Sequence, residues 1–189
     1  MLPAFEVRTA RLTLRPLVAS DRQAFLRYQS VSRDHLAPWL PLRAPGMDDA
    51  ALFDDQLRRA SEGLAAETDV RLSGFLADGR LAAQVALGQI FRRAFESAYA
   101  GWSVSADCVG AGLATEAVHG LLDIAFAPPP RGIGLHRVQA NIMPANARSI
   151  RVAEKCGFRR EGVARAYLRI AGRWEDHVMF AKLSEEHAG

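Results

Sequence analysis

The sequence has few cysteines, no long hydrophobic run and no secretion signal, and each absence excludes a class of protein. No apolar run reaches the roughly 18 residues of a membrane-spanning helix, and the first residues lack the charged and apolar regions of a signal peptide. The two cysteines, Cys108 and Cys156, form neither a disulfide framework nor a Cys-x-x-Cys pair, so we expect a cytoplasmic location. The five histidines and two cysteines show no metal-ligand spacing, so no metal site is expected.

The composition is typical of a globular protein. The 189 residues are 49% hydrophobic and 24% charged, and no repeat, linker or low-complexity segment divides them, so we expect a single domain over 1–189. The formal charge of +3 and the isoelectric point of 9.2 favour anionic partners. Basic residues nevertheless alternate with acidic ones, so no direct nucleic-acid motif is present.

Hydrophobic periodicity predicts an α+β order of elements. Ser20 is a plausible N-cap of a helix that runs to about Tyr28, and Asp78-Gly79 suits a type I′ hairpin turn. The apolar, proline-broken segment 36–41 is interpreted as core cover, with one wall of a substrate cleft as the alternative. The predicted strands cover 11–17, 70–77, 81–91, 98–105, 136–142, 158–170 and 174–183, and the predicted helices cover about 21–28, 48–66, 112–126 and 147–156.

The segment 109–114 joins a predicted strand to a helix that begins at about Gly112. Its small residues allow a backbone to approach a ligand closely, and the free amides and dipole of a helix start suit a phosphate. A glycine-rich turn without a ligand explains this stretch alone equally well. No G-x-x-x-x-G-K-[ST] loop is present, and the third glycine of the dinucleotide fingerprint is replaced by Thr115.

This loop resembles the acyl-CoA loop of the GNAT acetyltransferase superfamily, whose pattern is [Q/R]-x-x-G-x-[G/A]. Gly112 and Ala114 fit, and Val109 departs, since Gln or Arg is usual there. The order of elements matches the GNAT fold, an α+β fold with a mixed, mostly antiparallel central sheet flanked by helices. Further motifs along the chain are similar to the ribosomal-protein alanine N-acetyltransferases of the RimJ type, namely 9–16, 35–39, 99–102, 136–141, 143–146, 156–158, 161–162, 167–168, 172–174 and 176–178.

The resemblance implies direct attack of an amine on the thioester of acetyl-CoA, without a covalent enzyme intermediate. The backbone from Trp102 to Val104 would bind the pantetheine arm like an added strand, and the Asn146 side chain would hydrogen-bond the same arm. The amides that would hold the pyrophosphate belong to Val109, Gly110, Ala111, Gly112, Leu113 and Ala114.

The resemblance also implies catalytic residues. Many members of the superfamily protonate the leaving thiolate with a tyrosine whose place is taken by Ala153 here. Relatives that act on ribosomal proteins use a serine three residues after the Asn, so Ser149 is the candidate acid, with a structural first-turn serine as the alternative.

The sequence does not identify the general base. Some relatives carry a glutamate at the place of Asn141, which as an amide would position a water instead. Six other side chains are candidates for the base, each with a structural role as the alternative, namely Glu96, Glu116, Glu161, Asp176, His136 and His177.

We therefore expect an enzyme that acetylates a protein N-terminus, a ribosomal protein being one candidate, and that acts as a monomer or homodimer without a membrane. An α-amine, with a pKa of about 7.7–8.0 against about 10.4 for lysine, needs little help from a base. The segments 36–40 and 88–91 would form part of the peptide cleft. Two alternatives stay open: acetylation of a small amine such as an antibiotic or polyamine, and a non-catalytic acyl-CoA-binding or ribosome-associated module.

Overall fold

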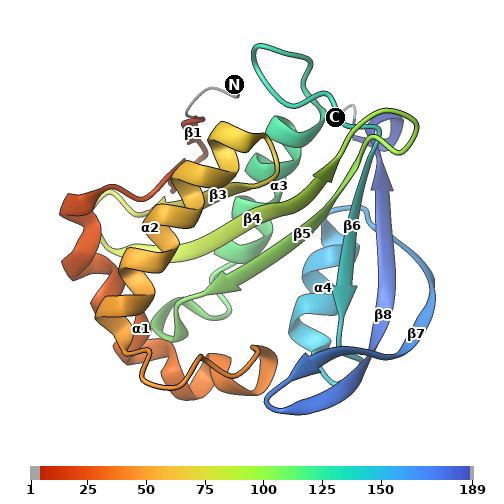
Figure 1. The fold of residues 1–189 in the computed structure, drawn as a ribbon. Coiled ribbons are helices and arrows are strands. Elements are labelled where there is room, and N and C mark those ends of the chain that lie inside the picture. Colours follow the sequence, from red (N-terminus) through yellow and green to blue (C-terminus); the bar gives the residue numbers. More distant parts are fainter. Residues whose placement is uncertain (1–4, 188–189) are drawn as a thin grey trace.

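The structure, a computed structural model, describes residues 5–187 (Figure 1). Residues 1–4, part of the segment examined above for a signal peptide, and residues 188–189 lie outside it. Within the described residues one eight-stranded sheet carries helices on both faces, which confirms the predicted α+β class. The strands are β1 (Val7–Arg8), β2 (Thr13–Arg15), β3 (Val70–Phe75), β4 (Leu81–Phe91), β5 (Ser97–Val104), β6 (Arg137–Ile142), β7 (Arg159–Ile170) and β8 (Arg173–Leu183), and the α-helices are α1 (Arg22–Leu36), α2 (Asp49–Ala66), α3 (Leu113–Phe126) and α4 (Ala147–Lys155).

The sheet is interrupted between β5 and β6. Its order is β1-β2-β3-β4-β5-β6-β8-β7, and all neighbours are antiparallel except the parallel pair β5 and β6. These two strands pair at only three positions, Ser97 with Arg137, Ala98 with Val138 and Tyr99 with Gln139. Beyond Tyr99 they diverge, as Figure 1 shows. The remaining edge of β5, residues 100–104, therefore has no strand beside it on that side within the described residues.

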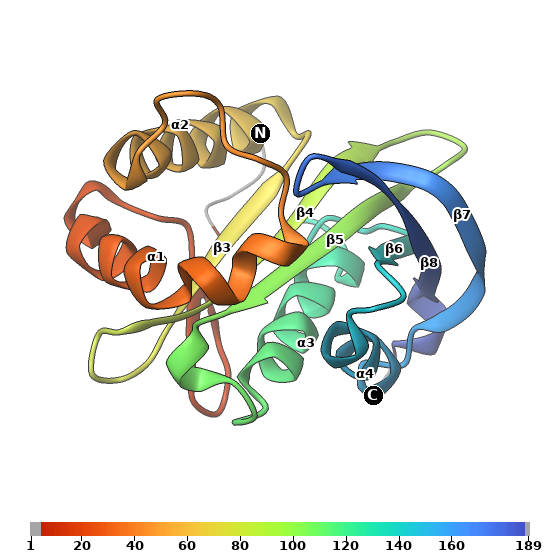
Figure 2. The ribbon, with the colours of Figure 1, turned by 90° about the horizontal axis from the view of Figure 1, so that it is seen from below.

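Two hydrophobic clusters hold the helices to the sheet. α1 and α2 cover one face and α3 and α4 the other (Figure 2). On the first face Phe25 and Phe53 meet edge to face with ring centroids 5.4 Å apart. On the second face, α3 buries the apolar stripe that the sequence predicted, namely Leu113, Ala117, Leu121 and Ile124. Burial of each leucine-sized side chain stabilises the fold by about 1.5–3 kcal/mol. No helix within residues 5–187 combines the length and apolarity that a bilayer span requires.

α1 is longer than the sequence predicted. It continues past Tyr28 to Leu36, and its inward face includes the buried polar residues Gln29 and Ser32. Because these two polar residues interrupt the apolar stripe, the hydrophobic periodicity predicted an end of the helix that is too early.

The prediction of Ser20 as the N-cap was also wrong. Ser20 lies in a short 3-10 helix, Ala19–Asp21, and the residue before α1 is Asp21. The Asp21 carboxylate accepts two 2.7 Å hydrogen bonds from the Arg15 guanidinium and one from the Val18 amide. It thereby ties β2 to the start of α1.

The predicted hairpin between β3 and β4 is present, but its turn is not type I′. A type I′ turn needs positive φ at both central residues. Here Gly79 has φ +83° and Asp78 does not have a positive φ. The Gly79 amide donates to the Leu76 carbonyl, closing a turn that ends on the glycine. The predicted strand 11–17 is reduced to β2, and β1, only two residues long, was not predicted.

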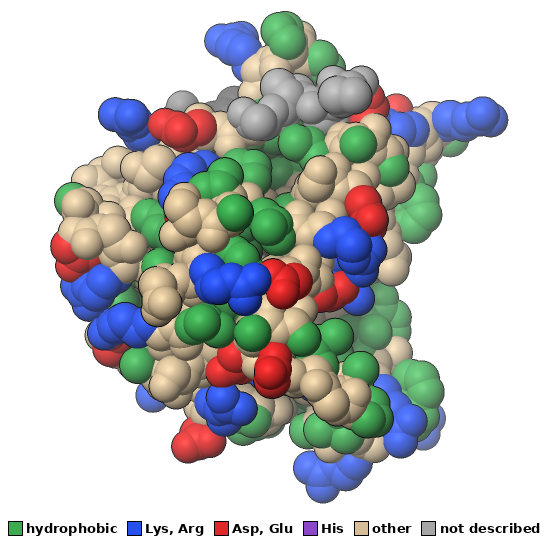
Figure 3. All heavy atoms as spheres, turned by 60° about the vertical axis from the view of Figure 1, so that its left-hand side comes forward, with side chains coloured by type: hydrophobic (Ala, Val, Ile, Leu, Met, Phe, Trp, Pro, Cys, Tyr) green, Lys and Arg blue, Asp and Glu red, His purple; other side chains and the backbone are tan. Residues whose placement is uncertain are grey.

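Several surface charges are locally paired. Arg58 on α2 contacts both Asp55 and Glu62, one turn before and after it. Figure 3 shows basic and acidic side chains interspersed on one face of the molecule. On that face the alternation of charges in the sequence therefore gives a mixed surface instead of a basic stripe.

Candidate active site

A cavity of about 1150 Å³ opens where β5 and β6 separate. Its walls come from the end of α1 and the segment after it, the free edge of β5, the glycine loop, the start of α4 and β8. Both predicted catalytic residues and eight of the nine predicted CoA-binding residues line it, namely Asn141, Ser149, Trp102, Val104, Val109, Gly110, Gly112, Leu113, Ala114 and Asn146.

The glycine loop presents its backbone to this cavity. Gly110 and Gly112 have φ of +85° and +79°, a conformation that favours glycine. Gly112 is the N-cap residue of α3, so the first amides of that helix have no intrahelical acceptor. These amides and the helix dipole form an anion-binding surface. The ninth predicted residue, Ala111, does not line the cavity, and its amide is already engaged with the Cys108 carbonyl.

Arg11 braces the loop from outside. Its Nη1 donates to the Ala111 carbonyl at 2.7 Å, and its backbone amide and Nε donate to Glu116 on α3. Burial would raise the pKa of Glu116, but hydrogen bonds from Thr9 and Arg11 outweigh it and hold the pKa below its ordinary value. Glu116, weighed above as a base, is therefore an ionised partner of Arg11 outside the cavity.

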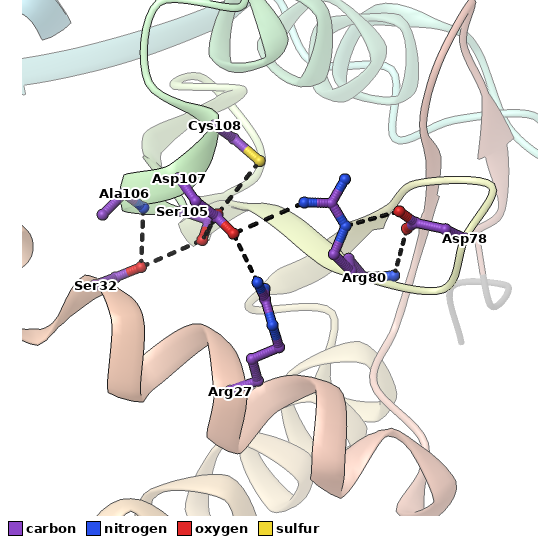
Figure 4. Close-up of polar contacts among 8 residues, drawn as sticks. All are labelled: Arg27, Ser32, Asp78, Arg80, Ser105, Ala106, Asp107 and Cys108. Atoms are coloured by element: carbon purple, nitrogen blue, oxygen red, sulfur yellow. Dashed lines mark hydrogen bonds and ion pairs between the residues drawn. The ribbon is translucent and has the colours of Figure 1, made fainter.

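A second polar cluster holds the segment that precedes the loop (Figure 4). Asp107, in the 3-10 helix Ala106–Cys108, accepts hydrogen bonds from Ser105 Oγ at 2.6 Å and from Arg27 Nη2 of α1 at 2.8 Å. Arg80 Nη1, after the β3–β4 turn, lies 3.7 Å away. The bonds from Ser105 and Arg27 lower the pKa of Asp107 to about 2. This carboxylate thus joins α1 and the β3–β4 connection to the start of the glycine loop.

Asn146 and Ser149 lie together at the start of α4. Asn146 Oδ1 accepts from the Ser149 amide at 3.1 Å, which confirms the predicted N-cap. The cap uses the amide oxygen and leaves the Nδ2 group to donate into the cavity. The Ser149 hydroxyl forms no hydrogen bond within the described residues, so the backbone-bonded alternative finds no support.

Three cations on α4 that the sequence reasoning missed line the same cavity: Arg148, Arg151 and Lys155. Within residues 5–187 none of them forms an ion pair. Their spacing of three and four residues places them on one side of the helix, and this pattern was available in the sequence. They suit the phosphates of a nucleotide-bearing ligand.

One wall of the cavity, formed by residues 36–40, is apolar. Leu36, Pro38, Trp39 and Leu40 line it, and Leu40 is 46% exposed. Four of the six residues in segment 36–41 therefore form a cleft wall, and of these four only Leu36 is buried in the core, so the core-cover interpretation was wrong for the other three. The predicted contribution of residues 88–91 was also wrong, since none of them lines this cavity.

The remaining candidate bases have other partners. Glu161 pairs with Arg137, and Asp176 accepts the Ala166 amide at 2.8 Å. Glu96 lies 3.6 Å from Arg92. Within the described residues none of these carboxylates reaches the cavity, and no cluster of three His, Cys, Asp or Glu side chains has a metal-binding arrangement.

The polar groups in the cavity fit acetyl-CoA. The cavity holds the free edge of β5, the loop amides and three cations that have no ion-pair partner among residues 5–187. Trp102 Nε1 is buried without a partner in the described structure, and Trp102 is among the residues that line the cavity. Burial and Asp107 raise the pKa of the Cys108 thiol, so it stays protonated at neutral pH and is a poor nucleophile.

Comparisons with known proteins agree with this geometry. Residues 11–159 match the family described as an acetyltransferase (GNAT) domain. The chain is 37% identical to a probable N-acetyltransferase, YjcK, of Bacillus subtilis (92% of this chain, 94% of that one) and 30% identical to the [ribosomal protein uS5]-alanine N-acetyltransferase of Escherichia coli (95% and 91%). It superposes on Mycobacterium smegmatis RimJ in complex with CoA-disulfide with a TM-score of 0.89 and 29% identity, covering 100% and 93% of the two chains. The chain therefore belongs to the GNAT acetyltransferases and is an N-acetyltransferase that uses acetyl-CoA.

Proposed function

We propose that the protein acetylates the N-terminal α-amine of a protein or peptide. The observation that carries this proposal is the lining of the cavity, which has an apolar wall at residues 36–40 and, within the described residues, no carboxylate. An α-amine is partly neutral near pH 7.5 because its pKa is about 7.7–8.0. Such an acceptor needs neither a strong base nor a carboxylate to bind it.

The donor half of the proposal assigns roles to the residues of the cavity. Residues 102–104 of β5 pair with the pantetheine amides, and Asn146 Nδ2 donates to the same arm. The loop amides of Val109, Gly110, Gly112, Leu113 and Ala114 bind the pyrophosphate, while Arg148, Arg151 and Lys155 add positive charge. Bound acetyl-CoA supplies the activated thioester carbonyl.

The chemical step relies on positioning. The Ser149 hydroxyl donates a proton to the departing thiolate, and Asn141 positions the acceptor or a water. Asn141 Nδ2 donates to Tyr167 Oη at 3.1 Å and its Oδ1 accepts from Gln139, so its orientation is fixed. Holding two reactants in this way lowers the barrier without a covalent intermediate.

A ribosomal protein in the cytoplasm is the acceptor we propose, because the Escherichia coli relative is named for ribosomal protein uS5. Small amines are the competing class. A polyamine carries several positive charges, and within the described residues no carboxylate lines the cavity to bind them.

The test is a set of acceptors incubated with acetyl-CoA and analysed by mass spectrometry. We expect transfer to a peptide that begins with alanine and none to its N-terminally blocked copy containing lysine. Equal modification of the blocked peptide, or transfer to small amines alone, would reject the α-amine assignment. Binding of acetyl-CoA without transfer to any amine would favour a non-catalytic module.

A further inference from the structure

The described lining of the cavity contains few groups able to accept a proton. Its titratable side chains are His35, Cys108, Arg148, Arg151, Lys155 and His177. The guanidinium and ammonium groups are donors only, and the Cys108 thiol already donates to Asp107. The two histidines are the side chains that remain.

The ring of His177 has a defined orientation. It lies on β8, is 3% exposed, and places Nδ1 3.0 Å from the Glu175 carbonyl oxygen. A carbonyl oxygen can only accept, so Nδ1 carries the hydrogen and Nε2 of the neutral ring keeps its lone pair. By contrast, the ring of His35, at the end of α1, forms no hydrogen bond within the described residues.

The register of the sheet places His177 beside Asn141. Asn141 on β6 pairs with Met179 on β8, and His177 is two residues before Met179 on the same strand. Side chains two apart on a strand share a face, so Asn141 and His177 are diagonal neighbours, typically about 7–8 Å apart. Tyr167 contacts both: its hydroxyl accepts from Asn141, and its ring meets the His177 ring with centroids 5.6 Å apart.

The Tyr167 side chain reaches this position because β7 is irregular there. The register between β7 and β8 shifts between Ala164 and Leu168, and Ala166 has a φ of +45°. Asp176 holds the irregular turn by accepting the Ala166 amide. Burial and the neighbouring Tyr99 raise the pKa of Tyr167, so its hydroxyl stays neutral and does not compete for the proton.

We propose that His177 is the general base, accepting at Nε2 the proton that the acceptor amine loses, directly or through one water. The nitrogen forms its bond to the acetyl carbon as the carbon–sulfur bond breaks. The amine proton passes to His177, the thiolate takes a proton from Ser149, and solvent carries one proton from the imidazolium back to the serine. The step is therefore neutral overall, and it rests on the proposed acetyl transfer.

The first test replaces His177 with Asn, which keeps a donor at the place of Nδ1 for the Glu175 carbonyl but has no Nε2. We expect kcat to fall about 10²–10⁴-fold, with acetyl-CoA affinity unchanged by calorimetry. His136→Gln is the control, because His136 is exposed and does not line the cavity. A kcat for His177→Asn within threefold of the unaltered protein, under conditions where chemistry limits turnover, would overturn the proposal.

A second measurement uses the unaltered protein and does not depend on the folding of a variant. The acceptor is a hydrazide, which is neutral across the range of about pH 5 to 8 in which a histidine changes charge. We expect kcat/KM to fall on the acid side even with this acceptor, and a flat profile would overturn the proposal. If His35→Asn abolishes the fall in kcat/KM at low pH and His177→Asn does not, the base is His35. No transfer by the unaltered protein to any amine would reject the proposed function itself.

Discussion

Replacement of Asp107 with Asn tests whether the cluster in Figure 4 holds the acyl-CoA loop. The amide has nearly the same shape but removes the charge that Arg27 and Ser105 hydrogen-bond. These contacts lower the pKa of Asp107 from 3.8 to about 2, which corresponds to roughly 2 kcal/mol of stability at neutral pH. Because the side chain is 33% exposed, solvent screening reduces this to about 1–2 kcal/mol.

The pH dependence of this effect has a definite sign. The folded pKa of Asp107 is depressed, so its contribution is complete above the ordinary value of 3.8 and is lost as the pH falls through about 2. The difference in unfolding free energy between Asp107→Asn and the unaltered protein should therefore be full at pH 7. It should fall to roughly half at pH 3.

Two assays measure the outcome. Thermal unfolding should show a Tm lowered by roughly 2–8 °C. If about 1 kcal/mol of the lost free energy reaches the loop, calorimetry should show an acetyl-CoA Kd raised about fivefold.

Asp78→Asn is the matched control, because Asp78 binds the same Arg80 at the exposed turn. We expect it to leave the acetyl-CoA Kd unchanged. An unaltered Tm in Asp107→Asn, or an equal change in Kd in both variants, would refute the reasoning.

Three further predictions concern the donor side. Gly112→Val should cost about 1–2 kcal/mol of strain and weaken acetyl-CoA binding in calorimetry, whereas Gly46→Val, with a similar φ of +77° outside the cavity, should leave the Kd unchanged. Ser149→Ala should lower kcat about 10²–10⁴-fold with an unchanged acetyl-CoA Kd; an undiminished kcat in rapid-quench experiments would remove it from the mechanism. Replacing Arg151 and Lys155 with Gln should raise the Kd for CoA and flatten its dependence on salt, and an unchanged salt dependence would contradict their role.

The sequence predicted most of the fold because its patterns are local. The stripe on α3 and the strands β3 to β8 follow directly from periodicity. The predictions were wrong where tertiary contacts decide the outcome. Gln29 and Ser32 are buried because Arg43 and the segment before the glycine loop supply their partners, and no local pattern predicts that.

The candidate site was predictable where it is built from one segment. The loop 109–114 and the Asn146 cap are such segments. The cluster around Asp107 was not predictable, because Arg27 is 80 residues away in the chain. Likewise, the position of His177 beside Asn141 depends on the β6–β8 register, which no single stretch of sequence specifies.

The three residue pairs between β5 and β6 have a mechanical consequence. They make the sheet two panels, one of five strands and one of three, that share a short hinge of main-chain bonds. α3 and α4 pack against each other on one face of the sheet, and α3 contacts strands of both panels. A ligand that hydrogen-bonds to the open edge of β5 and also contacts α4 adds noncovalent connections between the two panels, away from the three paired positions. Such a ligand would stiffen the whole sheet, and slower amide exchange should extend to strands that it does not touch.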